Sequence, residues 1–184
     1  MPPMSARSPA PPKLLHRGVK FDLELAEQPT ADGGTVARER IVHRGSVVIL
    51  PLLRGTDGEE RVVMIRNHRF AVDRVLWELP AGTLDPDEAP VACAGRELVE
   101  ETGYRAADLS PLLSFYPAPG FLTELMHAFV ARELTHVGQR LEPTERIEVE
   151  PLPWSDVLEL VRANRVEDAK TIATLLYHRA FSPV

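Results

Sequence analysis

Residues 82–104 read GTLDPDEAPVACAGRELVEETGY, and residues 88–102 of this stretch are expected to fold as a helix. Small or apolar residues recur in it at helical spacing and would face a core. They are Val91, Gly95, Leu98, Val99 and Thr102. Gly103 is a typical helix terminator, and Pro86 and Pro90 fall near the start, where proline is tolerated.

Acidic residues follow the edge of the same helix. Glu97 and Glu101 lie one turn apart, and Glu100 is three residues from Glu97. At about 5 Å two carboxylates repel by roughly 3 kcal/mol at an effective dielectric of about 20, so a helix carries such a pair only with compensation. A divalent cation that prefers oxygen ligands, Mg²⁺ or Mn²⁺, would supply it, whereas the simpler alternative is a solvated acidic face.

An arginine accompanies these acids. Arg96 lies four residues before Glu100, at the spacing of a helical salt bridge. Such a bridge would fix the Glu100 carboxylate and leave Glu97 and Glu101 freer to bind a metal. The expected role of Arg96 is therefore orientation.

The spacing of these residues resembles the Nudix box. Gly82 is followed after five residues by Glu88, and after seven more by the run RELVEETG over 96–103 and then a hydrophobic position. The last position is Tyr104 instead of the usual aliphatic residue, but the amphipathic ring can still pack there. The chain is therefore similar to Nudix hydrolases.

This resemblance implies a loop, helix and loop that bind one to three divalent ions, and hydrolysis of a nucleoside diphosphate linked to another group. It implies that Glu97 and Glu101 are direct metal ligands and that Glu100 binds through water or directly. Arg96 would be the orienting cation and Glu88 a supporting acid. Mg²⁺ is the expected cofactor, with Mn²⁺ as a substitute, because a metal neutralises the anionic pyrophosphate and lowers the pKa of bound water.

Residues beside the box resemble the ADP-ribose pyrophosphatase branch of that family. Residues 77–82 read WELPAG, and residues 119–124 read PGFLTE. In that branch the carbonyl of the residue here numbered Ala81 contacts metal, and the loop glutamate, here Glu124, positions or deprotonates the attacking water. The resemblance also implies a set of substrate-binding positions. They are Trp77, Glu78, Gly82, Pro119 and Gly120.

Each of these flanking features also has a simpler explanation. Trp77 fits a core or interface aromatic, Pro119 with Gly120 fits an ordinary turn, and Glu124 fits a solvated side chain. Their joint order relative to the box favours the substrate site.

Arg69 ends a stretch, 61–70, that reads as a buried strand followed by a polar turn. In the branch that the chain resembles, this strand ends in Gln-Tyr-Arg, and the arginine contacts the diphosphate with a planar fork. Asn67 and His68 replace the first two residues here, and a surface arginine is the alternative. The run DAKT at 168–171 also resembles the branch, although a capped helix would explain it by itself.

The remaining pattern predicts one domain over 16–184 after a mobile, proline-rich tail over 1–15; five of the 17 prolines fall within residues 1–12. Alternating residues at 19–24 and 36–43 around Asp32-Gly33-Gly34 predict a hairpin. Further strands are expected at 46–53, 112–116, 125–131 and 147–152. Helices are expected at 155–164 and 168–180, with Ser155 and Asp168 as N-caps.

These elements predict an α+β protein, and the resemblance implies a Nudix-type α/β/α sandwich with a mixed β-sheet and an N-terminal β-hairpin extension. In the branch the hairpin segment, here 16–45, is exchanged between subunits, so a homodimer is expected. The net charge of −6 argues against nucleic acid as a partner. No run suits a signal peptide or membrane span, and the single Cys93, expected on the polar side of its helix, is consistent with a reducing cytoplasm.

The sequence therefore leads to a metal-dependent pyrophosphatase that splits ADP-ribose, a nucleoside diphosphate sugar, into AMP and ribose 5-phosphate. A pyrophosphatase for GDP-mannose or another sugar nucleotide is the alternative within enzymes. A sensor domain that binds ADP-ribose without turnover is the alternative of another class, although such modules usually lack box carboxylates that this chain retains.

Overall fold

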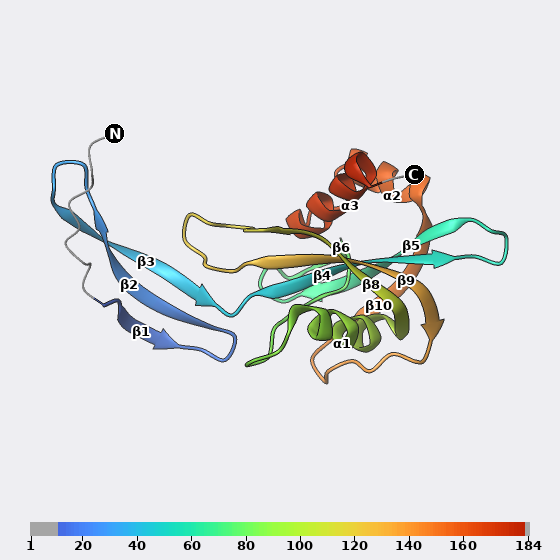
Figure 1. The fold of residues 1–184 in the computed structure, drawn as a ribbon, viewed down its shortest axis with the longest axis horizontal. Coiled ribbons are helices and arrows are strands. Elements are labelled where there is room, and N and C mark those ends of the chain that lie inside the picture. Colours follow the sequence, from blue (N-terminus) through green and yellow to red (C-terminus); the bar gives the residue numbers. More distant parts are fainter. Residues whose placement is uncertain (1–10, 183–184) are drawn as a thin grey trace.

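A mixed β-sheet with helices on both faces forms the body of the protein in a computed structural model, which describes residues 11–182 (Figure 1). The central strand order is β10-β5-β4-β9-β8, in which β4 and β9 are parallel and the other pairs antiparallel. Their bounds are β4 Ser46–Arg54, β5 Glu60–Arg69, β8 Tyr104–Phe115, β9 Met126–His136 and β10 Ile147–Pro153. Two short strands, β6 (Arg74–Glu78) and β7 (Ala81–Thr83), pair with β5 and β4 respectively.

Strand β4 is buried on both of its faces, as its apolar run predicts. Val47 and Ile49 belong to one core cluster, whereas Val48 and Leu50 belong to the other. The first cluster packs under α1 (Pro90–Thr102), and the second packs under α2 (Trp154–Arg162) and α3 (Ala169–Phe181). The expected α/β/α sandwich is confirmed.

Helix α1 begins two residues later than expected and ends at Gly103, whose φ of 74° is left-handed. Two positions on it differ from the expectation. Val91 is 49% exposed, and Cys93, expected on the polar side, is fully buried. The buried face of α1 is rotated relative to the expected one. It includes Glu97 and Glu101, which places Cys93 inside and Val91 at the surface.

The two C-terminal helices lie where the sequence places them. Asp168 caps α3 and accepts a hydrogen bond from the backbone N–H of Thr171, at 3.0 Å. The expectation of Ser155 as a cap is wrong: α2 starts after Pro153, and the Ser155 hydroxyl donates to the neighbouring Asp156 instead.

The N-terminal segment forms a three-stranded sheet, here called the arm, made of β1 (Lys13–Arg17), β2 (Phe21–Pro29) and β3 (Thr35–His43). The expected hairpin is β2 and β3, which are antiparallel over their full lengths. Strand β1 was not expected, so residues 13–15 belong to a strand instead of the tail; residues 1–10 of that expected tail lie outside the described residues.

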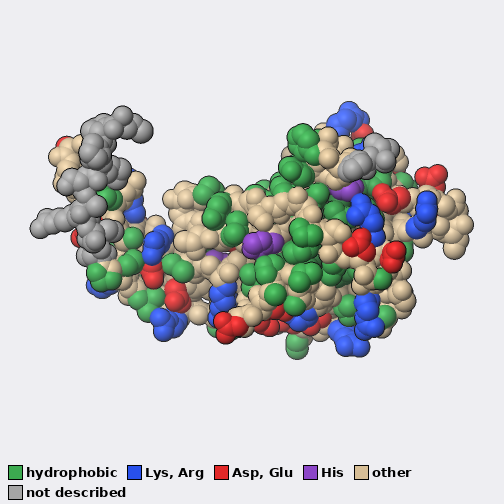
Figure 2. Space-filling model, viewed as in Figure 1, with side chains coloured by type: hydrophobic (Ala, Val, Ile, Leu, Met, Phe, Trp, Pro, Cys, Tyr) green, Lys and Arg blue, Asp and Glu red, His purple; other side chains and the backbone are tan. Residues whose placement is uncertain are grey.

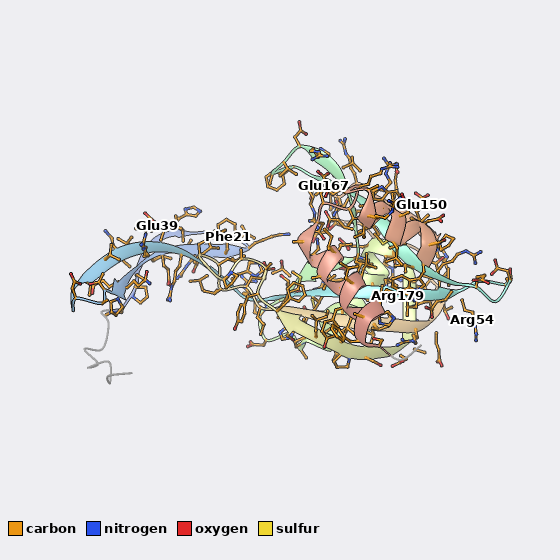
Figure 3. The ribbon with its side chains drawn as sticks, turned by 90° about the horizontal axis from the view of Figure 1, so that it is seen from above. Phe21, Glu39, Arg54, Glu150, Glu167 and Arg179 are labelled. Atoms are coloured by element: carbon orange, nitrogen blue, oxygen red, sulfur yellow. The ribbon has the colours of Figure 1, made fainter. Side chains whose placement is uncertain are left out.

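The arm stands off from the body as a narrow extension, with hydrophobic and charged side chains intermixed on its surface (Figure 2). Phe21 and Glu39 both lie on it, whereas Arg54 marks the opposite end of the body (Figure 3). Several apolar side chains of the arm are exposed, among them Phe21 at 47%.

Backbone hydrogen bonds attach the base of the arm to the loop between β8 and β9. The Ile41 N–H donates to the Phe121 carbonyl at 2.8 Å, and the Thr123 N–H donates to the Ile41 carbonyl at 2.9 Å. The Thr123 hydroxyl also accepts from the His43 N–H. In residues 11–182 none of the helices has the length and apolarity needed to span a bilayer.

Candidate active site

The first element of the site is the close contact between β7 and α1. A Cβ built on Gly82 would lie 1.9 Å from the carboxyl carbon of Glu97, far inside any real contact distance. Only glycine therefore lets the Glu97 carboxylate rest against the backbone of β7. The side chain of Glu97 is largely buried, and this burial raises its pKa.

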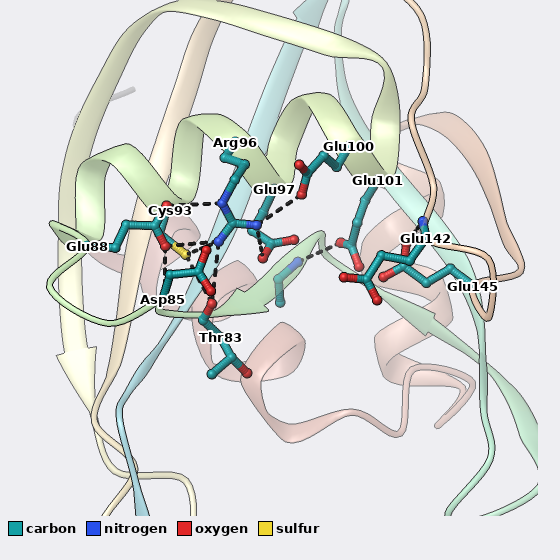
Figure 4. Close-up of polar contacts among 11 residues, drawn as sticks. Thr83, Asp85, Glu88, Cys93, Arg96, Glu97, Glu100, Glu101, Glu142 and Glu145 are labelled. Carbon is teal, nitrogen blue, oxygen red and sulfur yellow. Dashed lines mark hydrogen bonds and ion pairs between the residues drawn. The ribbon is translucent and has the colours of Figure 1, made fainter. Parts of the chain in front are cut away.

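Arg96 lies at the centre of the acidic residues (Figure 4). Its guanidinium donates to both oxygens of Glu88, at 3.0 and 2.9 Å, and holds the pKa of that carboxyl at about 2. It also donates to Glu97 at 2.7 Å and to Glu100 at 3.0 Å. The expected pairing with Glu100 is present, but Arg96 does not leave Glu97 free. Of the four glutamates of the box, only Glu101 has no contact with Arg96 in the structure.

Glu101 is the most deeply buried acid of the helix, with 3% of its surface exposed. Its carboxylate accepts a hydrogen bond from the Ala81 N–H at 2.8 Å, and the side chain of Gln139 donates to its backbone carbonyl. Burial, with a smaller effect from the charge of Glu97, raises the pKa of Glu101 to about 8 despite the bond from Ala81.

A further carboxylate lies near these residues and was missed by the sequence reasoning. Glu145, in the loop between β9 and β10, lies across from Glu101 in Figure 4. Its charge raises the pKa values of both Glu97 and Glu101. The only sequence signal was a group of acids in the polar segment 142–150, which carries no spacing motif of its own.

The described residues contain no ready-made cluster of three metal-ligating side chains. The donors nevertheless fit a divalent cation that prefers oxygen, because Glu97 and Glu101 are two buried carboxylates whose ionisation burial opposes. Glu97 and Glu101 would hold such an ion. Bound there, it would neutralise phosphate charge and make a bound water more acidic.

Glu78 and Arg69 form a bidentate ion pair. Arg69 donates through Nε at 2.8 Å and Nη2 at 2.6 Å to the two oxygens of Glu78, which is 1% exposed. Burial alone would raise the pKa of Glu78, but the bonds from Arg69 and the charge of Lys170 bring it below its ordinary value. The charge of Arg69 in turn lowers the pKa of Glu101, whose carboxylate accepts the bond from Ala81, three residues after Glu78.

Trp77 points to the other face of β6 from Glu78, as alternation along a strand requires. It packs against the core under α2 and α3, and the Arg66 guanidinium lies 5.7 Å from its ring centroid. The core explanation of Trp77 therefore fits its position, and the side chain is not brought to the acids of the box.

The loop between β8 and β9 carries the other expected residues. Pro119 and Gly120 are exposed, and Gly120 lines a shallow hollow of about 380 Å³ together with β2 and β3 of the arm. Glu124 is partly buried, accepts a hydrogen bond from the Ser46 hydroxyl, and lies 3.9 Å from Nδ1 of His43. Ser46 pairs with Thr83 in the sheet, so Glu124 is anchored beside the strand that holds Gly82.

Comparison with known proteins identifies the class. Residues 42–176 match the NUDIX domain family, and this span contains the box, helix α2 and the first part of α3. The chain therefore belongs to the Nudix family, and it is a hydrolase that acts on pyrophosphate bonds. Nudix hydrolases generally use divalent metal ions, in agreement with the donors described above.

Two relatives place the chain within the family. It is 36% identical to the ADP-ribose pyrophosphatase of Bacillus subtilis (strain 168) over 165 residues, which cover 89% of this chain and 87% of the relative. It is 35% identical over 173 residues to the GDP-mannose pyrophosphatase of Salmonella typhimurium, with 88% and 85% covered. The chain is thus a homologue of ADP-ribose pyrophosphatase.

A solved structure supports the fold. The crystal structure of ADP compounds hydrolase superimposes with a TM-score of 0.79, covering 97% of this chain and 96% of that one at 23% sequence identity. The match confirms the architecture over nearly the whole chain, with the arm included in the span.

The environment of Glu101 predicts that replacing it with glutamine stabilises the metal-free protein in alkaline solution. The folded-state pKa of about 8 exceeds the ordinary 4.5, so ionisation opposes folding and stability is lost as pH rises through that window. Glu101→Gln removes this cost, so the variant should gain about 5 kcal/mol over the native protein near pH 9 and less than about 1 kcal/mol near pH 5. Urea unfolding in the presence of a chelator measures the difference.

Glu159→Gln is the matched control, because Glu159 lies exposed on α2 and, among residues 11–182, forms an ion pair only with Arg162. It should leave the pH dependence unchanged. A gain for Glu101→Gln that is equal at both pH values would contradict the account of its burial.

Proposed function

We propose that the protein hydrolyses ADP-ribose to AMP and ribose 5-phosphate with Mg²⁺ as its metal, for which Mn²⁺ can substitute. The observation that carries the proposal is the proximity of two kinds of group. The buried carboxylates suited to a cation, Glu97 and Glu101, lie beside the segment that holds Arg69: the Ala81 N–H donates to Glu101, and Arg69 is bonded to Glu78, three residues before Ala81. A magnesium diphosphate needs both a carboxylate-bound metal and an arginine at one place.

Each residue of the box has a role in this proposal. Glu97 and Glu101 hold the metal, together with the Ala81 carbonyl, and Glu100 joins them directly or through water. Arg96 orients the acids, since it contacts Glu97 and Glu100 at once. Gly82 provides the space in which the Glu97 carboxylate sits.

Substrate contacts come from outside the box. Arg69 offers its exposed side to the diphosphate, and Glu78 holds that arginine in place. Pro119 and Gly120 lie in the loop that borders the arm and would contact the nucleotide or sugar. The position of Trp77 in the core makes its expected contribution indirect, through the placement of Glu78 on the next residue of β6.

Hydrolysis requires a base that accepts a proton from the attacking water, and two carboxylates are suitable. Glu124 was expected from its place after the box, and it accepts a bond from Ser46. Glu145 lies across from Glu101 in Figure 4, and its charge raises the pKa values of Glu97 and Glu101, the proposed metal ligands. We therefore propose Glu145 as the base, because it faces a proposed metal ligand, and Glu124 as a residue that positions the loop.

GDP-mannose is the second candidate substrate. The relative that bears its name is nearly as similar to this chain as the one named for ADP-ribose, at 35% against 36% identity. Both substrates carry a diphosphate between a nucleoside and a sugar, so the same acids and Arg69 would serve either. The higher identity places ADP-ribose first.

We also propose a homodimer formed through the arm. Its three-stranded sheet has no helix packed on it in residues 11–182, and it exposes large apolar side chains. They include Leu14, Leu15, Val19, Phe21 and Val36. A cytoplasmic location is proposed as well, for which the single, buried thiol of Cys93 is the support.

Incubation with ADP-ribose and Mg²⁺ should release AMP and ribose 5-phosphate in equal amounts, as measured by chromatography. Without metal there should be no release, because the diphosphate charge stays unneutralised. Glu97→Gln should lose at least about a thousandfold in kcat, since it removes a ligand. Faster cleavage of GDP-mannose than of ADP-ribose would move the assignment to that substrate, and binding without cleavage of either would indicate a sensor.

Glu145→Gln is expected to lower kcat by at least about a hundredfold with little change in KM, because a base acts in the transition state. Glu124→Gln should lower kcat by less than about tenfold, as a loss of positioning. Glu142→Gln, in the same loop as Glu145, is the control and should stay close to the native rate. A larger loss of kcat for Glu124→Gln than for Glu145→Gln would make Glu124 the base.

Phe21→Asp should break the dimer, because it puts a charge on the apolar surface of the arm. We expect the mass measured by light scattering to fall from that of two chains to that of one. Phe181→Asp is the control: this aromatic residue is 72% exposed on α3, away from the arm, and the variant should remain dimeric. A native protein that already runs as a monomer would refute the proposed dimer.

A further inference from the structure

The beginning of α3 contacts the segment that enters the active site. Lys170 reaches Glu78 with its Nζ atom 2.6 Å from Oε2, and the same nitrogen lies 3.0 Å from Asp168. The hydroxyl of Thr171 accepts a hydrogen bond from the Leu79 N–H at 2.8 Å. The first turn of α3 thus holds the chain at Glu78 and Leu79, which lie three and two residues before Ala81.

Four charged side chains are linked in this contact, in the order Arg69, Glu78, Lys170, Asp168. Glu78 is 1% exposed and the side chain of Lys170 is 12% exposed, so both charges are largely removed from water. A buried carboxylate of this kind needs full compensation. Here it receives two cations, while Asp168 balances the second.

The geometry of Arg69 leaves one side of its guanidinium available. Glu78 occupies the side formed by Nε and Nη2. A guanidinium has five N–H donors, so the end formed by Nη1 and the second hydrogen of Nη2 still has donors to offer. The Arg69 side chain is 41% exposed, which makes that end accessible to an anion.

We propose that Lys170 is a positioning residue for the diphosphate of the substrate, acting through Glu78 on Arg69. Lys170 neutralises part of the charge on Glu78, and the outer end of Arg69 therefore keeps its attraction for phosphate oxygens. Without Lys170 the linked group would change from neutral to a net negative charge, and the arginine would be compensated by Glu78 alone. The inference rests on the proposed role of Arg69 in diphosphate binding.

A purely structural role is the competing explanation, since Lys170 also fastens α3 to β6. The two explanations differ in what a change of charge does. A structural role predicts that any variant that loosens this helix lowers the melting temperature and weakens anion binding to the same extent. A positioning role predicts weaker binding of an anion, repaired by any residue that restores the positive charge.

Titration calorimetry with inorganic diphosphate, in the absence of metal, separates them. Lys170→Met should raise the dissociation constant for diphosphate about tenfold. Lys170→Arg should bring this constant back to within about threefold of the native value. Thr174→Ala is the matched control, because this buried threonine bonds to the Lys170 carbonyl and carries no charge. It should lower the melting temperature yet bind diphosphate as the native protein does.

A second comparison tests the route through Glu78. In a Glu78→Gln background, Lys170→Met should change the dissociation constant by less than about twofold, because the charge it balances is gone. The inference would be overturned if Lys170→Met raised the dissociation constant as much in the Glu78→Gln background as in the native protein, or left the native constant unchanged. It would also be overturned if Thr174→Ala weakened diphosphate binding as much as Lys170→Met, or if the native protein did not bind diphosphate.

The failure of the proposed function would look different. Native protein that binds diphosphate with the expected dependence on Lys170, but releases no AMP from ADP-ribose with Mg²⁺, would refute the substrate and leave the role of Lys170 supported.

Discussion

The burial of two carboxylates on one face of α1 is the constraint on which the site depends. Glu97 and Glu101 are less than a tenth exposed, and burial opposes the ionisation of both. The surrounding structure tolerates this by local means: Gly82 makes room for one carboxylate, the Ala81 N–H donates to the other, and Arg96 joins the first to its neighbours. The metal-free protein thus keeps electrostatic strain at the place where a cation would relieve it.

The sheet supplies the rigidity that this arrangement needs. Strand β4 is apolar on both faces and joins the core under α1 to the core under α2 and α3. Its first residues pair with β7, so the backbone that contacts Glu97 and Glu101 is fixed to the centre of the molecule. The opposite helix α3 reaches the same segment through Lys170 and Thr171. Elements from both layers therefore meet at residues 78–82.

Much of this could be predicted from the sequence, because periodicity and spacing are local. The apolar run of β4, the hairpin of the arm and the helix that carries Glu97 and Glu101 were all found in this way. Strands β6 and β7 were missed as strands because they are short and have little alternation of their own. The position of Glu145 across from Glu101 and the bond between Lys170 and Glu78 arise from residues far apart in the chain, and no local pattern encodes them.

The attachment of the β8–β9 loop to the arm is made largely by main-chain groups, between Ile41, Phe121 and Thr123. Main-chain bonds do not depend on which side chains the residues carry. The backbone path of this loop therefore does not depend on its side chains. The exposed Phe121 could be replaced while that path is kept. Such a loop is a natural place for relatives with one scaffold to diverge in the base or sugar they accept, and a suitable starting point for redesign.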